Sequence, residues 1–61
     1  MAPTREQIEA VQRTLTNNPS MVWNGKFGFY SNGQIIIDIW WSFDEPKEIF
    51  KITYNKDGSI D

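Results

Sequence analysis

The feature that most constrains the fold is the stretch 34–43, where apolar and mixed positions alternate. Each odd position holds a large apolar side chain, namely Ile35, Ile37, Ile39, Trp41 and Phe43. The even positions are mixed and read Gln34, Ile36, Asp38, Trp40 and Ser42. Because successive side chains of a strand point to opposite faces of a sheet, this alternation predicts a central strand with one wholly buried face.

Two further segments alternate in the same way and predict the neighbouring strands. The first segment contributes Trp23, Phe27 and Phe29, and the last contributes Phe50, Ile52 and Tyr54. We expect strands over about 21–30, 34–43 and 47–55, joined as an antiparallel meander. Asn24-Gly25 interrupts the first strand and indicates a bulge there, because a residue without a side chain lets a strand bend.

The N-terminal segment predicts a helix over about 4–17. Thr4 and Gln7 have the spacing of a capping box, in which each side chain satisfies the backbone N–H of the other residue. Pro19 ends the segment, since the residue before a proline is disfavoured in the helical conformation. The inward stripe, at spacings of three and four, consists of Ile8, Val11 and Leu15. The predicted fold is therefore α+β, with one N-terminal helix packed on a three-stranded antiparallel β-meander (αβββ).

The first turn could be a two-residue Asn-Gly turn or a three-residue loop with Gly33 in the left-handed conformation. A two-residue turn would place the phenylalanines of the first strand on the polar face, and a slip of one residue turns every side chain over. We therefore predict the three-residue loop, which pairs Phe29 with Ile35. It also places Lys26 opposite Asp38, as a cross-strand pair of opposite charge.

The second turn, at 44–47, pairs Phe43 with Glu48 in our predicted register. In this register Lys51 lies opposite Trp40. The residues that we expect in the core are Ile8, Val11, Leu15, Trp23, Phe27, Phe29, Ile35, Ile37, Ile39, Trp41, Phe50 and Ile52.

The chain of 61 residues fits one domain, 1–61, with a short C-terminal tail at 56–61. A domain of this size buries only about 60% of the surface that its unfolded chain exposes, so the three Trp, four Phe and two Tyr must supply most of the bulk. The net charge is −2, and the longest apolar run is 35–37, far short of the roughly 20 residues that span a bilayer. We expect a soluble, cytoplasmic protein that does not bind membranes.

Candidate catalytic or metal-binding residues are few. Cys and His are absent, which excludes disulfides, thiolate chemistry and the commonest zinc ligands. Asp44 and Glu45 are adjacent in a turn, where we expect them to keep the turn solvated. Asp38 is explained by its predicted surface pair with Lys26. The tail resembles part of a calcium loop, but Thr53 would stand at its first ligand position, where a carboxylate is needed. We expect no enzyme, no cofactor, no metal and no small-molecule substrate.

The remaining candidate site is the outer face of the sheet, because one short helix can cover only one face of three strands. The residues predicted to bind a partner there are Tyr30, Ile36, Trp40, Ile49 and Lys51. We also expect Gly28 to leave a hollow beside Ile36. In the competing interpretation, the stem of Lys51 shields Trp40 as a cation–π pair and the termini fold over the rest of the face.

The function that this pattern favours is a small, non-enzymatic protein–protein interaction module, acting as a homodimer, an inhibitor or an adaptor. Chains of this size and composition are common among accessory proteins of phages and other mobile elements, which is an analogy of composition only. The alternative is a single-stranded nucleic-acid-binding protein. In such a protein the bases would stack on Tyr30, Trp40 and Phe29. The phosphate backbone would contact Lys26, Lys47 and Lys51. A net charge of −2 leaves little counterion release to drive such binding.

Overall fold

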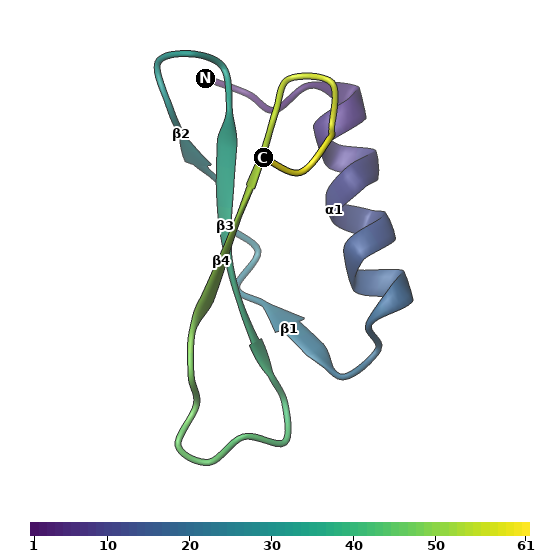
Figure 1. Cartoon of the computed structure of the whole chain (residues 1–61), viewed down its shortest axis with the longest axis vertical. Helices are drawn as coiled ribbons and strands as arrows, with labels where there is room; N and C mark the ends of the chain where they lie inside the picture. Colours follow the sequence, from purple (N-terminus) through teal and green to yellow (C-terminus); the bar gives the residue numbers. More distant parts are fainter.

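The computed structural model describes residues 1–61 as one helix and a sheet of four strands, with β3 at its centre (Figure 1). The elements are α1 (Arg5–Asn17), β1 (Met21–Trp23), β2 (Gly28–Phe29), β3 (Ile35–Trp41) and β4 (Phe50–Tyr54). Strands β1 and β2 pair with successive parts of one edge of β3, and β4 pairs with its other edge, always antiparallel. The predicted α+β fold of a helix and an antiparallel meander is thus confirmed, with the first predicted strand divided into β1 and β2.

The caps of α1 are those that the sequence predicts. The Thr4 hydroxyl accepts a hydrogen bond from the backbone N–H of Gln7 at 3.1 Å, and the Gln7 side chain accepts one from the N–H of Thr4 at 2.8 Å. The helix ends at Asn17, just before Asn18-Pro19. Its buried residues are Gln7, Ala10 and Val11. The inward stripe is therefore centred one residue earlier than expected, which leaves Ile8 at its margin.

The three-residue loop between β2 and β3 is confirmed. Phe29 pairs with Ile35, and the N–H of Tyr30 donates to the carbonyl of Gln34 at 3.0 Å. Gly33 has a φ of +89°, a conformation that only glycine adopts without strain. The loop chemistry and the burial of Ile35 therefore select the same register.

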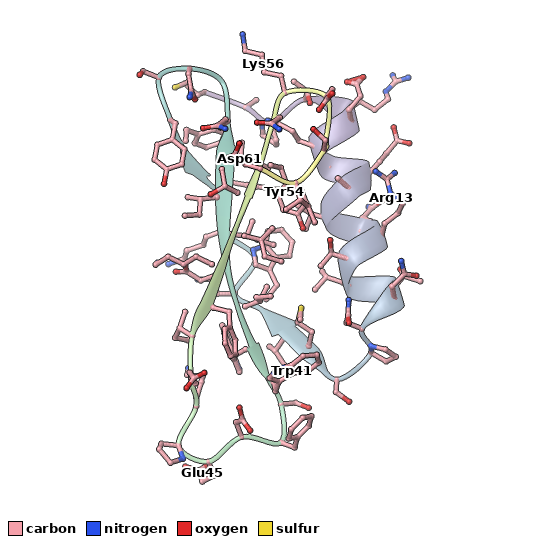
Figure 2. All side chains as sticks on the ribbon, viewed as in Figure 1. Arg13, Trp41, Glu45, Tyr54, Lys56 and Asp61 are labelled. Atoms are coloured by element: carbon pink, nitrogen blue, oxygen red, sulfur yellow. The ribbon has the colours of Figure 1, made fainter.

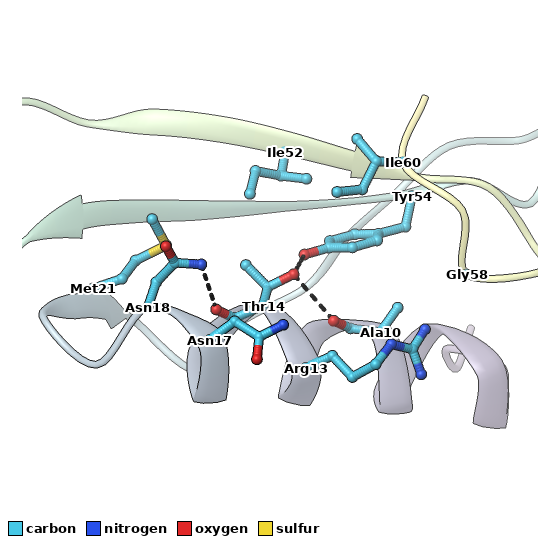
Figure 3. A pocket seen from close by; sticks show the side chains of 10 residues that line it. All are labelled: Ala10, Arg13, Thr14, Asn17, Asn18, Met21, Ile52, Tyr54, Gly58 and Ile60. Carbon is cyan, nitrogen blue, oxygen red and sulfur yellow. Dashed lines mark hydrogen bonds between the residues drawn. The ribbon is translucent and has the colours of Figure 1, made fainter.

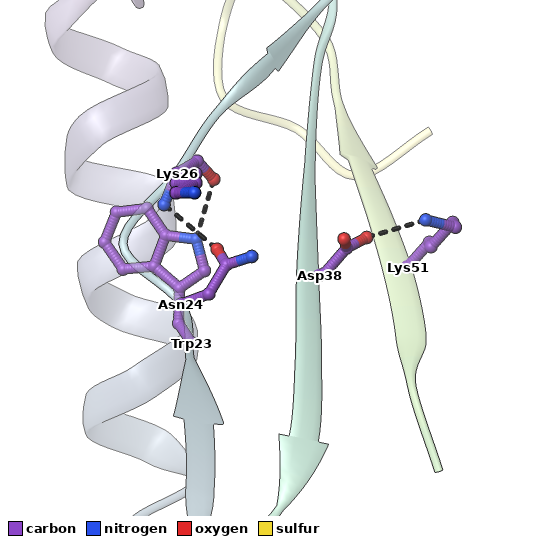
Figure 4. Close-up of polar contacts among 5 residues, drawn as sticks. All are labelled: Trp23, Asn24, Lys26, Asp38 and Lys51. Atoms are coloured by element: carbon purple, nitrogen blue, oxygen red, sulfur yellow. Dashed lines mark hydrogen bonds and ion pairs between the residues drawn. The ribbon is translucent and has the colours of Figure 1, made fainter.

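The interruption between β1 and β2 is larger than a single-residue bulge. Trp23 pairs with Ile39 and Gly28 pairs with Ile36, so residues 24–27 lie across from only residues 37–38. The indole N–H of Trp23 donates to the carbonyl of Lys26, and the Asn24 side chain accepts from the Lys26 N–H (Figure 4). These bonds hold the segment as a small loop, and the predicted pairing of Lys26 with Asp38 is wrong.

The predicted register between β3 and β4 is wrong by two residues. Ile39 pairs with Phe50 rather than with Ile52, and Lys51 lies opposite Asp38 rather than Trp40. An even shift keeps every side chain on its predicted face, so hydrophobicity alone could not distinguish the two registers. The observed register brings Lys51 to the carboxylate of Asp38 and leaves a longer turn, residues 42–49, between the strands.

The core lies between α1 and the face of the sheet that the helix covers. Its buried members are Ala10, Val11, Ile35, Ile37, Ile39 and Tyr54, and the residues packed against them are Leu15, Met21, Trp23, Phe27 and Ile52. Tyr54 is fully buried, and its hydroxyl lies 2.6 Å from that of Thr14 on α1. Three predicted core residues, Ile8, Phe29 and Phe50, are 38–40% exposed. Ile8 lies at the margin of the inward stripe of α1, and neither Phe29 nor Phe50 belongs to the core under the helix.

The C-terminal tail turns back beside the start of α1. Tyr54 and Ile60 form an isolated bridge, as expected for a stub too short to be a strand. Gly58 packs against the helix so closely that a Cβ there would lie 2.6 Å from the carbonyl oxygen of Glu6. The single helix, α1, is neither long enough nor apolar enough to cross a membrane.

Candidate protein-interaction surface

The outer face of the sheet is the side that α1 does not cover. The odd residues of β3 belong to the core with α1, so its even residues, Ile36, Asp38 and Trp40, point to the outer face. Lys51 joins them because it lies directly opposite Asp38. Tyr30 and Ile49 follow the end of β2 and precede the start of β4, and each is 45% exposed.

An ion pair occupies the middle of this face. Lys51 Nζ lies 2.8 Å from Asp38 Oδ1, and both side chains are substantially exposed (Figure 4). An exposed pair of this kind stabilises a fold by about 0–1 kcal/mol. Its main consequence is therefore to divide the apolar groups of the outer face into two parts, one around Ile36 and Tyr30 and the other around Trp40.

Trp40 is shielded by a lysine, although not by the one predicted. Lys47 Nζ, from the turn between β3 and β4, lies 4.3 Å from the centroid of the Trp40 ring. Such a contact contributes about 0.5–1 kcal/mol at an exposed site. Val22 pairs with Trp40 across β1 and β3. The indole is thus half-buried, with Val22 on the neighbouring strand and the side chain of Lys47 over its ring.

The hollow predicted beside Ile36 is filled. A Cβ placed on Gly28 would lie only 2.6 Å from Cγ2 of Ile36, so the Ile36 side chain already occupies the space that glycine leaves. This end of the outer face has no recess for a ligand side chain. It offers a flat apolar surface instead, with Tyr30 beside it.

The C-terminal tail does not cover the outer face. Gly58 packs against Glu6 and Ala10 of the helix. The Thr4 hydroxyl donates to the carbonyl of Lys56 at 2.9 Å. Both contacts hold the tail on the side of the sheet where α1 lies, so the interpretation in which this terminus shields the patch is wrong.

The titratable groups were compared with the arrangements that bind metals. No three His, Cys, Asp or Glu side chains gather as metal ligands would. Hydrogen bonds from the hydroxyl and the backbone N–H of Ser59 lower the pKa of Asp57. These bonds lie within the tail turn, where they stabilise the turn itself.

A second apolar surface, which the sequence analysis did not find, lies on the inner face beyond the end of α1. Trp41 and Phe43 stack there with ring centroids 5.7 Å apart, and Phe43 is 70% exposed. Figure 2 shows Trp41 towards the β3–β4 turn, at the opposite end of the molecule from Lys56. The 13 residues of α1 span about 20 Å, whereas the molecule is 34 Å long. A comparison of the expected lengths of the helix and of the strands could have predicted this surface from the sequence.

Comparison of the chain with protein-family models, with curated proteins and with solved structures finds no match. The fold itself defines the class, a small α+β domain in which one helix covers part of one face of an antiparallel sheet.

Proposed function

We propose that the protein is a non-enzymatic protein-interaction domain that binds its partner through the outer face of the sheet around Trp40. The observation that carries the proposal is a sheet face that α1 does not cover, with a half-buried tryptophan at one end and Tyr30, 45% exposed, beside Ile36 at the other. Ile49, just before β4, is also 45% exposed. Trp and Tyr are among the residues most enriched in the hot spots of protein interfaces. Groups of exposed apolar side chains on one surface usually mark interaction sites.

A second copy of the chain is the partner that this face suits best. A two-fold interface brings the same patch together from both copies, so the patch must complement itself. The ion pair of Lys51 and Asp38 meets this condition, because a second copy can present Asp38 to Lys51 and Lys51 to Asp38. An inhibitor or adaptor that uses the same face on a different protein is the other outcome that the experiment below distinguishes.

Binding of single-stranded nucleic acid is less well supported. Lys47 lies over the Trp40 ring that would have to stack on a base, and Lys51 already pairs with Asp38. Both lysines would have to leave these partners, and the net charge of −2 opposes the approach of a phosphate backbone. Quenching of tryptophan fluorescence by oligonucleotides at low salt would favour this function instead.

Size-exclusion chromatography with light scattering tests the proposed dimer. We expect the wild type to dimerise, Ile49→Ser and Trp40→Ser to shift the equilibrium towards the monomer, and Phe43→Ser to leave it unchanged. Phe43 is a matched control because it is an exposed apolar residue of the inner face. Circular dichroism checks that each variant is folded.

Two results would contradict the proposal at different levels. A wild type that remains monomeric at about 1 mM, where even an interaction of about −4 kcal/mol becomes visible, would exclude the second copy as partner. The outer face itself would be excluded if, in a pull-down, the Ile49→Ser variant retained the same proteins as the wild type.

A further inference from the structure

Three dipeptides of the chain can close a five-membered ring with their own backbone, and they are Asn24-Gly25, Asn32-Gly33 and Asp57-Gly58. In each of them, the backbone nitrogen of glycine can attack the side-chain carbonyl carbon of the residue before it. Glycine has no side chain that obstructs this approach. The three glycines also share a positive φ, of 80°, 89° and 88°, so the surroundings of each glycine decide which dipeptide reacts.

The Asn32-Gly33 dipeptide is held in an unreactive arrangement. The N–H of Gly33 donates to the carbonyl of Tyr30 at 3.1 Å. The glycine N–H must lose its proton before its nitrogen attacks, and a hydrogen-bonded N–H is released only when its bond opens. The side-chain amide of Asn32, which is the group that would leave, donates to Oε1 of Gln34 at 3.0 Å. Gly33 is also packed against the side chain of Lys56.

The Asp57-Gly58 dipeptide is restrained in a similar way. The N–H of Gly58 donates to the carbonyl of Asn55 at 2.9 Å. Gly58 is buried against α1, where a Cβ on it would lie 3.3 Å from Cβ of Ala10 (Figure 3). A carboxyl group is attacked in its protonated form, whereas hydrogen bonds from Ser59 lower the pKa of Asp57 and so favour the ionised form. Both the attacking group and its target therefore oppose ring closure here.

The Asn24-Gly25 dipeptide differs from the other two. The N–H of Gly25 donates to no other group of the chain, and nothing lies within 4 Å of the position that a Cβ on Gly25 would take. Asn24, Gly25 and Lys26 are all exposed. Oδ1 of Asn24 accepts from the N–H of Lys26 at 3.0 Å, just as Oδ1 of Asn32 accepts from that of Gln34. The two asparagine sites thus differ in the glycine N–H and in the amide that leaves.

We propose that Asn24-Gly25 is a site of spontaneous deamidation in the folded protein, with water as the only co-reactant. The nitrogen of Gly25 gives its proton to hydroxide from the solvent and forms a bond to Cγ of Asn24. The bond between Cγ and the amide nitrogen breaks, and that nitrogen takes a proton from water and leaves as ammonia. Water then adds to one of the two carbonyl carbons of the cyclic imide, and the ring nitrogen takes up a proton as its bond to that carbon breaks.

Addition of water at Cγ gives aspartate, and addition at the main-chain carbon gives an isoaspartyl linkage. Both products alter the loop that holds Trp23 (Figure 4). The indole N–H of Trp23 donates to the carbonyl of Lys26, within the segment 24–27, whose ends are fixed by the pairing of β1 and β2 with β3. The isoaspartyl form lengthens the main chain of this segment by one carbon atom and so displaces Lys26. The proposal does not rest on the proposed function.

Mass spectrometry of the full chain tests the proposal. The folded protein is incubated at mildly alkaline pH and then cleaved with trypsin after Lys and Arg, which places Asn24 and Asn32 in different peptides, 14–26 and 27–47. Conversion of the amide to a carboxyl group raises the mass of the peptide, and fragmentation locates the residue. We expect Asn24 to react about twofold to tenfold faster than Asn32, the factor expected when one hydrogen bond must first be lost.

The unfolded chain in guanidinium chloride is the matched control, because it lacks the hydrogen bond of Gly33. Asn24 and Asn32 should react there at similar rates, and the incubation continues until both have reacted. The variant Asn24→Gln should not react in peptide 14–26, because glutamine would have to close a larger ring. The proposal is overturned if the ratio of the two rates is the same in the folded and unfolded chains, or if Asn24 is stable in the folded protein.

Amide hydrogen exchange tests the difference between the glycines directly. The free N–H of Gly25 should exchange at about the rate of an unfolded chain, whereas the N–H groups of Gly33 and Gly58 should exchange more slowly. Protection of Gly25 equal to that of Gly33 would show that its nitrogen is not available, which would also overturn the proposal.

Nuclear magnetic resonance of the deamidated protein tests the effect on the loop. Ion exchange separates this protein from the unmodified chain by its additional negative charge. We expect the indole N–H signal of Trp23 to shift and that of Trp41 to stay unchanged. A Trp23 signal at the same position in both proteins would exclude the assigned effect on Trp23.

Discussion

Replacement of Gln7 by glutamate tests the contact that ties the three parts of the fold together. Gln7 is 1% exposed, and its Nε2 donates to the carbonyl of Gly33 at 2.9 Å and to that of Asn55 at 3.2 Å. Its Oε1 accepts from the N–H of Thr4 at 2.8 Å. One side-chain amide thus joins the start of α1 to the β2–β3 loop and to the tail.

The substitution Gln7→Glu changes the shape of this side chain very little but removes both of its donors. The carbonyl of Gly33 then lacks a partner, whereas that of Asn55 keeps the N–H of Gly58 at 2.9 Å. One unsatisfied buried group costs about 1–3 kcal/mol. A folded domain of this size is stable by about 3–9 kcal/mol. We therefore expect a loss of about 1–3 kcal/mol from this group, to which desolvation of the ionised carboxyl adds at neutral pH. This loss is a large fraction of the stability of the domain.

The loss should depend on pH in a defined direction. A protonated carboxyl can donate to one of the two carbonyls, whereas an ionised one can donate to neither and is also desolvated. Both effects raise the pKa of the introduced carboxyl in the folded state above its ordinary value of about 4.3. The variant should therefore be most stable below about pH 4 and lose stability as pH rises through the folded-state pKa, because the folded state binds more protons than the unfolded state.

Urea unfolding followed by tryptophan fluorescence at pH 7 and at about pH 4 measures this effect. The matched control is Gln12→Glu, the same chemical change at an exposed position of α1, where a change within about 0.5 kcal/mol is expected. The reasoning is refuted if Gln7→Glu matches the wild type at pH 7. A loss that is equally large at the lower pH would refute the assigned role of the two donors.

Two further predictions concern the tail. Asp57→Asn should remove part of the loss of stability on acidification, because hydrogen bonds from Ser59 lower the pKa of Asp57 in the folded state. The stability that the Asp57 carboxylate contributes is present above its ordinary pKa of about 3.9 and is lost as pH falls through the folded-state value. The urea midpoints of the wild type and the variant should therefore converge as pH is lowered from neutral to below about pH 4. Gly58→Ala should destabilise the fold by more than Gly25→Ala, with the difference measured by thermal unfolding. Both glycines have positive φ, which costs alanine about 1 kcal/mol, but only at Gly58 would the added Cβ also meet the helix backbone, at 2.6 Å. Equal losses would contradict this packing.

The sequence predicts those parts of the fold that neighbouring residues determine. The capping box of Thr4 and Gln7 and the loop with Gly33 involve residues at most a few positions apart, and each has one local solution. The strands are predicted from alternation for the same reason. Their faces, and therefore the outer position of Trp40, follow from parity alone.

The parts that were predicted wrongly depend on distant residues. The β3–β4 register differs by two residues because both registers bury the same faces, and the turn at 42–49 is too long to select one. The ion pair of Asp38 and Lys51 becomes visible only in the structure. The second role of Gln7 was missed because its partners, the carbonyls of Gly33 and Asn55, are 26 and 48 residues away along the chain.

The two uncovered surfaces have one origin, because the chain has a single helix. That helix lies on one face of the sheet, and its 13 residues span about 20 Å of a molecule 34 Å long. Only eight of the 61 residues are buried, so the fold draws its stability from few side chains. Ile49 lies outside the strands and is 45% exposed, so a polar residue in its place would remove an exposed apolar group from the surface. The partner that we propose on the outer face would give a reason for isoleucine at this position.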